Sequence, residues 1–520
     1  METEFQSPDQ IDVDAASATA PTGVEVQAHI TQAVAALVTW VLACQTLTFY
    51  EFETQLVPQV LALGRLFIQL FLCQREEQFQ TAHPQPEPGY QRQGPIPRQI
   101  GTLFGKVRYW RTYYFRPGDG YYPLDVALGL TSDGFSMALR SCAARVATKV
   151  SYAQTVLLLT LFLHWSPAQG SLEGMVLGLG RHTGAWFAQA PAPEGDGEVL
   201  VLQLDSKATP TATDAELEQR RGPRSPNPHP GSQRHRGRAA RQRRGSQPRR
   251  QKGDKAKNGK MATIVVLYTL RKNAEGTLEG PLNKKVYASY APKRHAVAIA
   301  RREAEKRGFG PGSGKRIQIV SDGDLDLERY IAEFFPAESF PALEHTIDVY
   351  HVVEYLWDAG ACLYREGSAE LTEWMEVQKA ALYAGRVAEI IAELDHRLAQ
   401  LDPQQSGVQE RLAKIRAYLA HRQTKMDYQR LREEDLEISS GAVEGAVRYV
   451  IAQRFDCGGM RWIKERAEAL LQLRCIEVNN DWEAFITFVH DTVRDQAQRE
   501  HTNLSLKCTT AAPLPTYGLT

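Results

Sequence analysis

The pattern of apolar and polar residues changes near residue 198. Before this point, from Ala28 to Leu72 and from Leu124 to Phe187, apolar residues recur every three or four positions, which is typical of amphipathic helices. After it, apolar runs of strand length alternate with helical segments. The order β-β-β-α-β-α-β predicts a mixed sheet with helices on its faces. The predicted strands are 199–205, 263–270, 284–290, 316–322 and 345–351, and the helices are 296–308 and 325–335.

The segments before this sheet have different patterns. A proline-rich linker, His83 to Pro97, precedes an alternating β-rich piece, Gly101 to Phe115, and the RPGDG turn that follows predicts a hairpin. Ser166 to Phe187 has the rhythm of short helix, glycine turn and short helix. This rhythm fits a DNA-binding helix-turn-helix module, but a corner of a helical bundle has it too.

The region after residue 355 is almost wholly helical. Two long amphipathic helices are broken at DPQQSG, a further helix begins near Ile438 with Ser439 or Ser440 as its N-cap, and a last helical segment starts at Trp462. We therefore expect an α/β fold with a large helical insertion, preceded by a mainly helical region. The expected parts are 1–25 (disordered), 26–97 (helices and linker), 98–190 (hairpin and helical region), 196–355 (mixed-sheet core), 356–435 (insertion), 436–490 (C-terminal helical region) and 491–520 (tail).

Charge is unevenly distributed along the 520 residues. The 61 Lys and Arg balance the 61 Asp and Glu, yet residues 219–260 hold fifteen basic residues and the single acid Asp254. This arm carries +14 and the remainder −14, so the chain predicts a basic arm that neutralises phosphates on an acidic body. A solvated low-complexity loop is the alternative. The densest basic residues are Arg220, Arg221, Arg241, Arg243, Arg244, Arg249 and Arg250.

The cysteines and the lengths of the apolar tracts indicate the cellular compartment of the protein. The seven cysteines are scattered without a CxxC pair, which favours a reducing environment and argues against a zinc knuckle. The acidic, polar N-terminus does not resemble a secretory signal, and the longest apolar tracts fall short of the ~20 residues that span a bilayer. We expect a soluble cytoplasmic protein.

Three acids are candidates for catalysis. Asp205 and Asp322 each end an apolar strand, and Glu444 lies near the start of a later helix among small residues. Oxygen ligands suit Mg²⁺, and several carboxylates are needed to offset the charge of two such ions. Each acid taken singly fits a structural role as well, because acids often follow strands and favour helix N-termini.

Together these acids resemble those of the DDE transposases, which have a ribonuclease-H-like fold. The run from Lys425 to Trp462, with its SGAVEGAV and GMRW segments, is similar to the catalytic-glutamate region of the ISKra group of bacterial insertion sequences. LDSKATPTATDAELEQRRGPR and IVSDGD resemble the segments around the two aspartates, and DVYH, ending at His351, resembles the C/DxxH motif of Mutator-like relatives. Two positions depart from the family pattern, Ser206 and Asp456.

The resemblance implies an enzyme and its partners. Asp205, Asp322 and Glu444 would hold two Mg²⁺, with Mn²⁺ as a substitute, for cleavage of double-stranded DNA at transposon ends and strand transfer into target DNA. His351 would orient a phosphate or move a proton, unless it is a packing or capping residue. Residues 98–190 would be the DNA-binding region and 196–355 the catalytic core, and Arg461 and Trp462 would also contact DNA. A homodimer or larger assembly on DNA, associated with the bacterial nucleoid, is expected. An inactive DNA-binding derivative and a nuclease without strand transfer remain alternatives.

Overall fold

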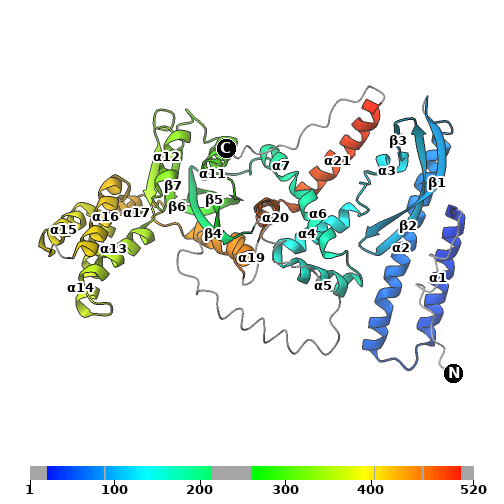
Figure 1. The fold of residues 1–520 in the computed structure, drawn as a ribbon, viewed down its shortest axis with the longest axis horizontal. Coiled ribbons are helices and arrows are strands. Elements are labelled where there is room, and N and C mark those ends of the chain that lie inside the picture. The colour runs from blue at the N-terminus through cyan, green and yellow to red at the C-terminus, as the bar shows by residue number, and fades with distance from the viewer. Residues whose placement is uncertain (1–19, 87–88, 213–258, 403–404, 458–461, 505–520) are drawn as a thin grey trace, which may run out of the picture. The chain divides into compact units, whose positions relative to one another are not determined.

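The computed structural model describes residues 20–86, 89–212, 259–402, 405–457 and 462–504 (Figure 1). The chain divides into two compact units. The first comprises Met1–Trp186 and Asp481–Thr520, and the second comprises Phe187–Asn480. We describe each unit by itself.

The first unit begins with a hairpin of two long helices, α1 (Gly23–Ala43) and α2 (Phe49–Ala82). Each starts with a capping box, in which a threonine and the glutamate three residues later satisfy each other's backbone N–H groups. Both helices are long and apolar enough to cross a membrane by length and composition alone, with 17% and 28% of the best window buried. The sequence-based expectation considered uninterrupted apolar tracts only. By the mean hydropathy of whole helices, the expectation that no segment is long enough to span a bilayer is wrong.

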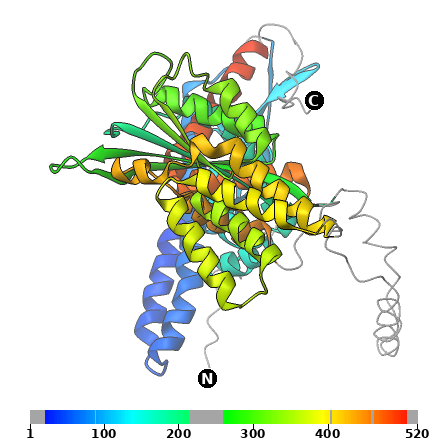
Figure 2. The same ribbon diagram turned by 90° about the vertical axis from the view of Figure 1, so that its left-hand side faces the viewer.

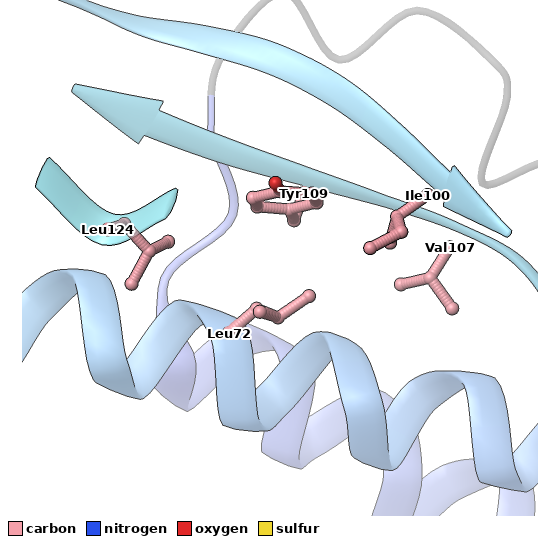
Figure 3. Packing of buried hydrophobic residues seen from close by; sticks show 5 residues of the cluster. All are labelled: Leu72, Ile100, Val107, Tyr109 and Leu124. Carbon is pink, nitrogen blue, oxygen red and sulfur yellow. The ribbon is translucent and has the colours of Figure 1, made fainter. Parts of the chain in front are cut away.

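A three-stranded antiparallel sheet of order β1-β2-β3 packs on α2. Figure 3 shows the cluster, in which Leu72 of α2 faces Ile100, Val107 and Tyr109 of the sheet, and Leu124 lies beside them. The predicted hairpin turn is confirmed, since Arg116 pairs with Asp119. The strands are β1 (Gln91–Thr102), β2 (Gly105–Arg116) and β3 (Asp119–Tyr121).

Part of the predicted proline-rich linker belongs to this sheet. Residues from Gln91 onward form β1, although the segment contains Pro95 and Pro97. Proline is tolerated there because β1 is an edge strand and its register with β2 shifts between Gln93 and Ile96. Composition alone therefore misplaced the start of the sheet.

Helices complete the first unit. Leu139 of α4, Leu159 of α5 and Leu172 of α6 share one buried cluster, so the segment with the helix-turn-helix rhythm packs as part of a helical bundle. The C-terminal helix α21 joins it, where Trp482 Nε1 donates a hydrogen bond to Ser141 Oγ (2.9 Å). The helices are α3 (Pro123–Leu128), α4 (Met137–Lys149), α5 (Tyr152–Leu163), α6 (Gln169–Gly180), α7 (Thr183–Gln189) and α21 (Trp482–Leu504).

The second unit is built on a five-stranded mixed sheet of order β6-β5-β4-β7-β8. β4, β5 and β6 are antiparallel neighbours, whereas β4, β7 and β8 are parallel. The α/β class and the predicted order β-β-β-α-β-α-β are confirmed. The elements are β4 (Val199–Pro210), β5 (Gly259–Lys272), β6 (Leu278–Ser289), α11 (Lys293–Lys306), β7 (Arg316–Ser321), α12 (Leu325–Phe334) and β8 (Leu343–Ile347).

Two strand ends differ from the prediction. β4 does not end at Asp205 but continues to Pro210, because its antiparallel pairing with β5 extends that far. The predicted strand 345–351 ends at Ile347, and a helix starts at Val349 with Asp348 as its N-cap. The side chain of Asp348 accepts a hydrogen bond from the Tyr350 N–H (3.0 Å), as an N-cap aspartate does.

The predicted helical insertion follows and forms one cluster, drawn in yellow-green to yellow (Figure 2). The two long helices broken near DPQQSG are confirmed as α15 and α16. Beyond the insertion, the chain returns to the sheet through α18 and a π-helix. The elements are α13 (Val349–Leu363), α14 (Ala369–Tyr383), α15 (Val387–Gln400), α16 (Ser406–Arg422), η2 (Gln423–Lys425), α17 (Tyr428–Glu433), α18 (Gly441–Ala446), η3 (Val447–Ala452), α19 (Gln453–Phe455) and α20 (Lys464–Val478).

Candidate functional site

The two candidate aspartates come from neighbouring parallel strands. Gln203 of β4 is in register with Val320 of β7, and Asp205 and Asp322 each follow two residues later. Burial raises the pKa of Asp205; a hydrogen bond from the Ser206 N–H (2.6 Å) opposes this rise, and the nearby negative charges of Asp322 and Glu444 add to it. The three predicted acids therefore lie within electrostatic reach of one another.

Two buried glutamines fix the segment that leads to Glu444. In β4, Gln203 donates from Nε2 to the Ser439 carbonyl (3.1 Å) and accepts at Oε1 from the Val443 N–H (3.0 Å). In β7, Gln318 donates to the Glu437 carbonyl (2.7 Å) and accepts from the N–H of that same residue (3.0 Å). Each glutamine amide thus binds the backbone as a neighbouring strand would, and residues 437–443 are held beside the sheet.

Glu444 lies in the first turn of α18, one residue beyond this held segment. Ser440 occupies the N-cap position as predicted, but its hydroxyl makes no capping hydrogen bond. It donates instead to Asp348 and, at 3.3 Å, to Glu444 Oε1. Ser440 thereby links the acid of α18 to the N-cap of α13.

His351 lies in the first turn of α13, not at the end of a strand as predicted. Its Nδ1 is 3.0 Å from Asp348 Oδ2, so the predicted ordering of His351 by Asp348 is present, with Asp348 itself fully buried. The hydrogen bond that His351 donates to Asp348 raises the pKa of His351 to about 9. Burial alone would raise the pKa of Asp348, but hydrogen bonds from His351 and Ser440 outweigh it and lower that pKa. At neutral pH the pair is an imidazolium and a carboxylate.

The turn after β7 is shaped by glycine and by helix α16. Gly323 has a φ of +78°, and a Cβ there would lie 2.7 Å from Arg422 Nε and 2.8 Å from the Tyr418 hydroxyl. Tyr418 donates to the Asp322 carbonyl (2.9 Å), and Arg422 donates to the Gly323 carbonyl (2.7 Å). The insertion therefore holds the backbone that carries Asp322.

A cavity of about 830 Å³ opens beside Asp322 and His351. Its far wall is α16, which contributes Arg411, Lys414 and His421. Arg411 and Lys414 also have acidic neighbours, because Arg411 pairs with Asp358 and Lys414 with Glu410. Of the three candidate acids, Asp322 thus lines a cavity that has Arg411 and Lys414 on its opposite wall.

The donor set fits a hard divalent cation in its chemistry. Asp205, Asp322 and Glu444 offer only oxygen atoms, and their mutual repulsion is what a cation would offset. As the side chains lie, no three acidic, histidine or cysteine groups within the described ranges form a ready-made metal cluster. A shared ion therefore requires the three carboxylates to come closer together than they lie in this structure.

The remaining predicted residues divide into two groups. Trp462 is described and is 9% exposed, with its ring centroid 5.1 Å from that of Phe455 and Arg454 over its face. Trp462 therefore packs against its own unit, and its predicted contact with DNA stays a prediction. Outside the described residues lie Arg461 and the arm residues Arg220, Arg221, Arg241, Arg243, Arg244, Arg249 and Arg250.

The departures from the family pattern have local partners. Asp456 Oδ2 lies 3.3 Å from Lys207 Nζ, so this acid meets a cation of β4. Ser206 Oγ lies 3.0 Å from Thr263 Oγ1 of β5. Both substitutions are accommodated by neighbouring strands and leave the three acids in place.

Sequence reasoning missed the two glutamines, although a signal for them was present. Gln203 and Gln318 are the polar residues inside otherwise apolar strands, and both are at most 1% exposed. A buried amide requires partners, so an isolated glutamine in such a strand predicts a segment packed alongside. The identity of that segment, 437–443, has no local signal because it lies more than a hundred residues away.

Comparison with known proteins leaves the family open. No protein-family model matches the chain, and no curated protein matches it. Among solved structures, it is similar to the "Drosophila P element transposase strand transfer complex", with 11% identity over 67% of this chain and 93% of that chain. The TM-score is 0.28, which indicates only a distant likeness.

Proposed function

We propose that this chain is a DDE-type transposase that cleaves DNA at transposon ends and transfers the strand into target DNA. In this proposal the second unit is a ribonuclease-H-like catalytic core of the kind found in the ISKra group. The observation that carries it is the meeting of Asp205 and Asp322 on adjacent parallel strands with Glu444, which Gln203 and Ser440 hold nearby. The chain order of the second unit, β-β-β-α-β-α-β, is the order predicted from the sequence and supports the proposal.

Asp205, Asp322 and Glu444 would hold Mg²⁺, or Mn²⁺ in its place. Such ions make water or a DNA 3′-hydroxyl a better nucleophile and stabilise the leaving oxygen. The protein's own part is to hold three carboxylates close together. Burial raises the pKa of Asp205, and a bound cation would oppose this rise.

His351 has the properties of a phosphate-orienting group. Its pKa of about 9 leaves it charged at neutral pH, so it is a poor base and a good hydrogen-bond donor to an anion. Asp348 occupies Nδ1, which leaves Nε2 to face a ligand. Of the two predicted roles, orientation of a phosphate is therefore favoured over proton transfer.

Double-stranded DNA is the proposed substrate. The cleft beside Asp322 has basic side chains from α16 on its far wall, and phosphates attract such groups. The basic arm of residues 219–260 joins β4 to β5, so it leaves the same strand that carries Asp205. We assign the arm to phosphate contacts outside the cleft, and a cytoplasmic, nucleoid-associated location follows from the substrate.

A labelled donor end incubated with the protein and Mg²⁺ tests the proposal. We expect cleaved donor and a joined product with target DNA, and we expect Asp322→Asn and Glu444→Gln to abolish both. Asp326→Asn, an exposed acid four residues beyond Asp322, is the matched control and should retain both. Cleavage without joining would indicate a nuclease, and DNA binding without cleavage would indicate an inactive derivative; either outcome contradicts the transposase.

A further inference from the structure

Helix α2 presents an apolar face that no other described part of its unit covers. One side packs on α1, where Cys73 joins Val26 and Ile30, and a second side packs on the sheet through Leu72. On a third side Val60, Phe67 and Phe71 are each about half exposed. A helix that is apolar all round is ordinarily buried all round, so this face predicts a partner.

The exposed positions follow a heptad. Alternating steps of three and four residues connect Tyr50, Glu53, Val57, Val60, Gly64, Phe67, Phe71, Gln74 and Gln78. Hydrophobic residues at this spacing form the seam along which two helices pack. We call the nine residues the α2 seam.

A lipid bilayer is a poor partner for this face. A spanning helix needs about 20 residues surrounded by hydrocarbon, and unpaired sheet edges do not occur there. The second half of α2 packs against β2, and the edge strand β1 lies beside β2. Thr112 N donates to Glu76 of α2 (2.9 Å), which places polar groups of the sheet along the helix. The face therefore suits a protein helix.

We propose that the α2 seam binds the α2 seam of a second copy of this chain, antiparallel and centred on Gly64. In this arrangement Val57 faces Phe71 of the partner, and Val60 lies next to Phe67 of the partner, one residue from the exact antiparallel register, so a small side chain meets a large one in each layer. Glu53 faces Arg75, which borders the seam, and both side chains are exposed in one chain. A parallel pair would instead bring Glu53 against Glu53, and like charges disfavour it.

The area suits a dimer. An aromatic side chain buries about 150–250 Å², and Phe49, Tyr50, Phe67 and Phe71 are 77%, 75%, 54% and 51% exposed. These four offer on the order of 500 Å², and the two valines bring the face toward the roughly 800 Å² per partner of a stable interface. Phe104, which lies over Gly64 and is 38% exposed, extends the apolar surface at its centre.

Sedimentation velocity of the full chain without DNA tests this inference. We expect twice the monomer mass of 58.2 kDa. Phe67→Glu should raise the dimer dissociation constant at least about tenfold, because two charges would be buried across the seam. The matched control is Val377→Glu in α14, an exposed valine of the second unit, which should leave the dimer unchanged.

Charge exchange tests the orientation. Glu53→Arg and Arg75→Glu should each weaken the dimer, and the double variant should restore it to within about threefold, since the pair is re-formed with its signs reversed. A wild-type monomer, a dimer insensitive to Phe67→Glu, or a double variant weaker than either single one would overturn the proposal. The proposal would also be overturned if the wild-type protein floats with phosphatidylcholine vesicles and the Phe67→Glu variant does not, because the α2 seam would then bind lipid. These measurements use neither DNA nor metal, so their outcome is independent of the proposed chemistry.

Discussion

Replacing Gln203 by leucine should separate Glu444 from the aspartates without removing any acid. Leucine has nearly the volume of glutamine but cannot bind the backbone of the segment before Glu444. The change leaves the Val443 N–H, the Ser439 carbonyl and the Tyr268 hydroxyl without the partner they have in the structure. Each buried polar group left in this way costs about 1–3 kcal/mol.

The expected loss can be bounded. The three groups together cost about 3–9 kcal/mol, and burial of the leucine side chain returns about 1.5–3 kcal/mol. The net loss of unfolding free energy is therefore centred on about 4 kcal/mol, within a range of about 0–8 kcal/mol. Gln318→Leu is the matched control. It also removes three hydrogen bonds, two to Glu437 and one to Thr346, but these lie farther along the chain from Glu444.

Urea unfolding and donor-end cleavage should be measured on both variants. We expect similar losses of unfolding free energy in the two variants. We expect a cleavage rate at least about tenfold lower for Gln203→Leu than for Gln318→Leu, since a displaced Glu444 that raises the activation free energy by about 1.4 kcal/mol slows the reaction tenfold. Equal cleavage rates in the two folded variants would refute the assignment of Gln203 as the positioning residue for Glu444.

Three further predictions concern the same unit. Because the pKa of His351 is raised to about 9, its charge is present below that pH and lost above it, so cleavage should fall as the pH rises through about 9, and His351→Gln should remove this limb of the rate profile. Gly323→Ala should lower the free energy of unfolding by more than the about 1–2 kcal/mol that an alanine costs in a left-handed conformation, because its Cβ would also meet Arg422 and Tyr418. Gly312→Ala is the control for the backbone cost alone, since Gly312 has a φ of +72° and open space around it. Equal losses in the two variants would refute the contact of Gly323 with Arg422 and Tyr418. Deleting residues 220–252 should flatten the dependence of DNA affinity on salt, and an unchanged slope would remove the arm from the DNA interface.

The sheet could be predicted from sequence because its strands contain nearly unbroken apolar runs, such as Val199–Leu202 in β4 and Ile264–Leu267 in β5. The start of α13 could not be predicted correctly from alternation alone. His345, Thr346 and Ile347 continue the pattern of a strand into Asp348, and the aspartate then begins a helix as its N-cap. An aspartate followed by an apolar helical pattern is a signal for the start of a helix. At Asp348 this N-cap signal is stronger evidence than the alternating pattern that precedes it.

The candidate site was predictable in its acids but not in its supports. Asp205 ends the apolar run of β4 and Asp322 follows β7, so both could be found from the sequence. The approach of Glu444 instead depends on pairing between segments more than two hundred residues apart. The return of α21 to the first unit is a similar case, since Trp482 meets Ser141 through packing that no local pattern encodes. Long-range contacts of this kind are fixed by three-dimensional complementarity.

Metal binding tests the central claim most directly. Calorimetric titration of the DNA-bound protein with Mn²⁺ should show binding that Asp205→Asn, Asp322→Asn and Glu444→Gln each weaken at least about tenfold, since each removes a charged ligand. The Asp326→Asn control should bind as the wild type does. Wild-type affinity in all three acid variants would contradict the account, because the carboxylates would then not act as one centre.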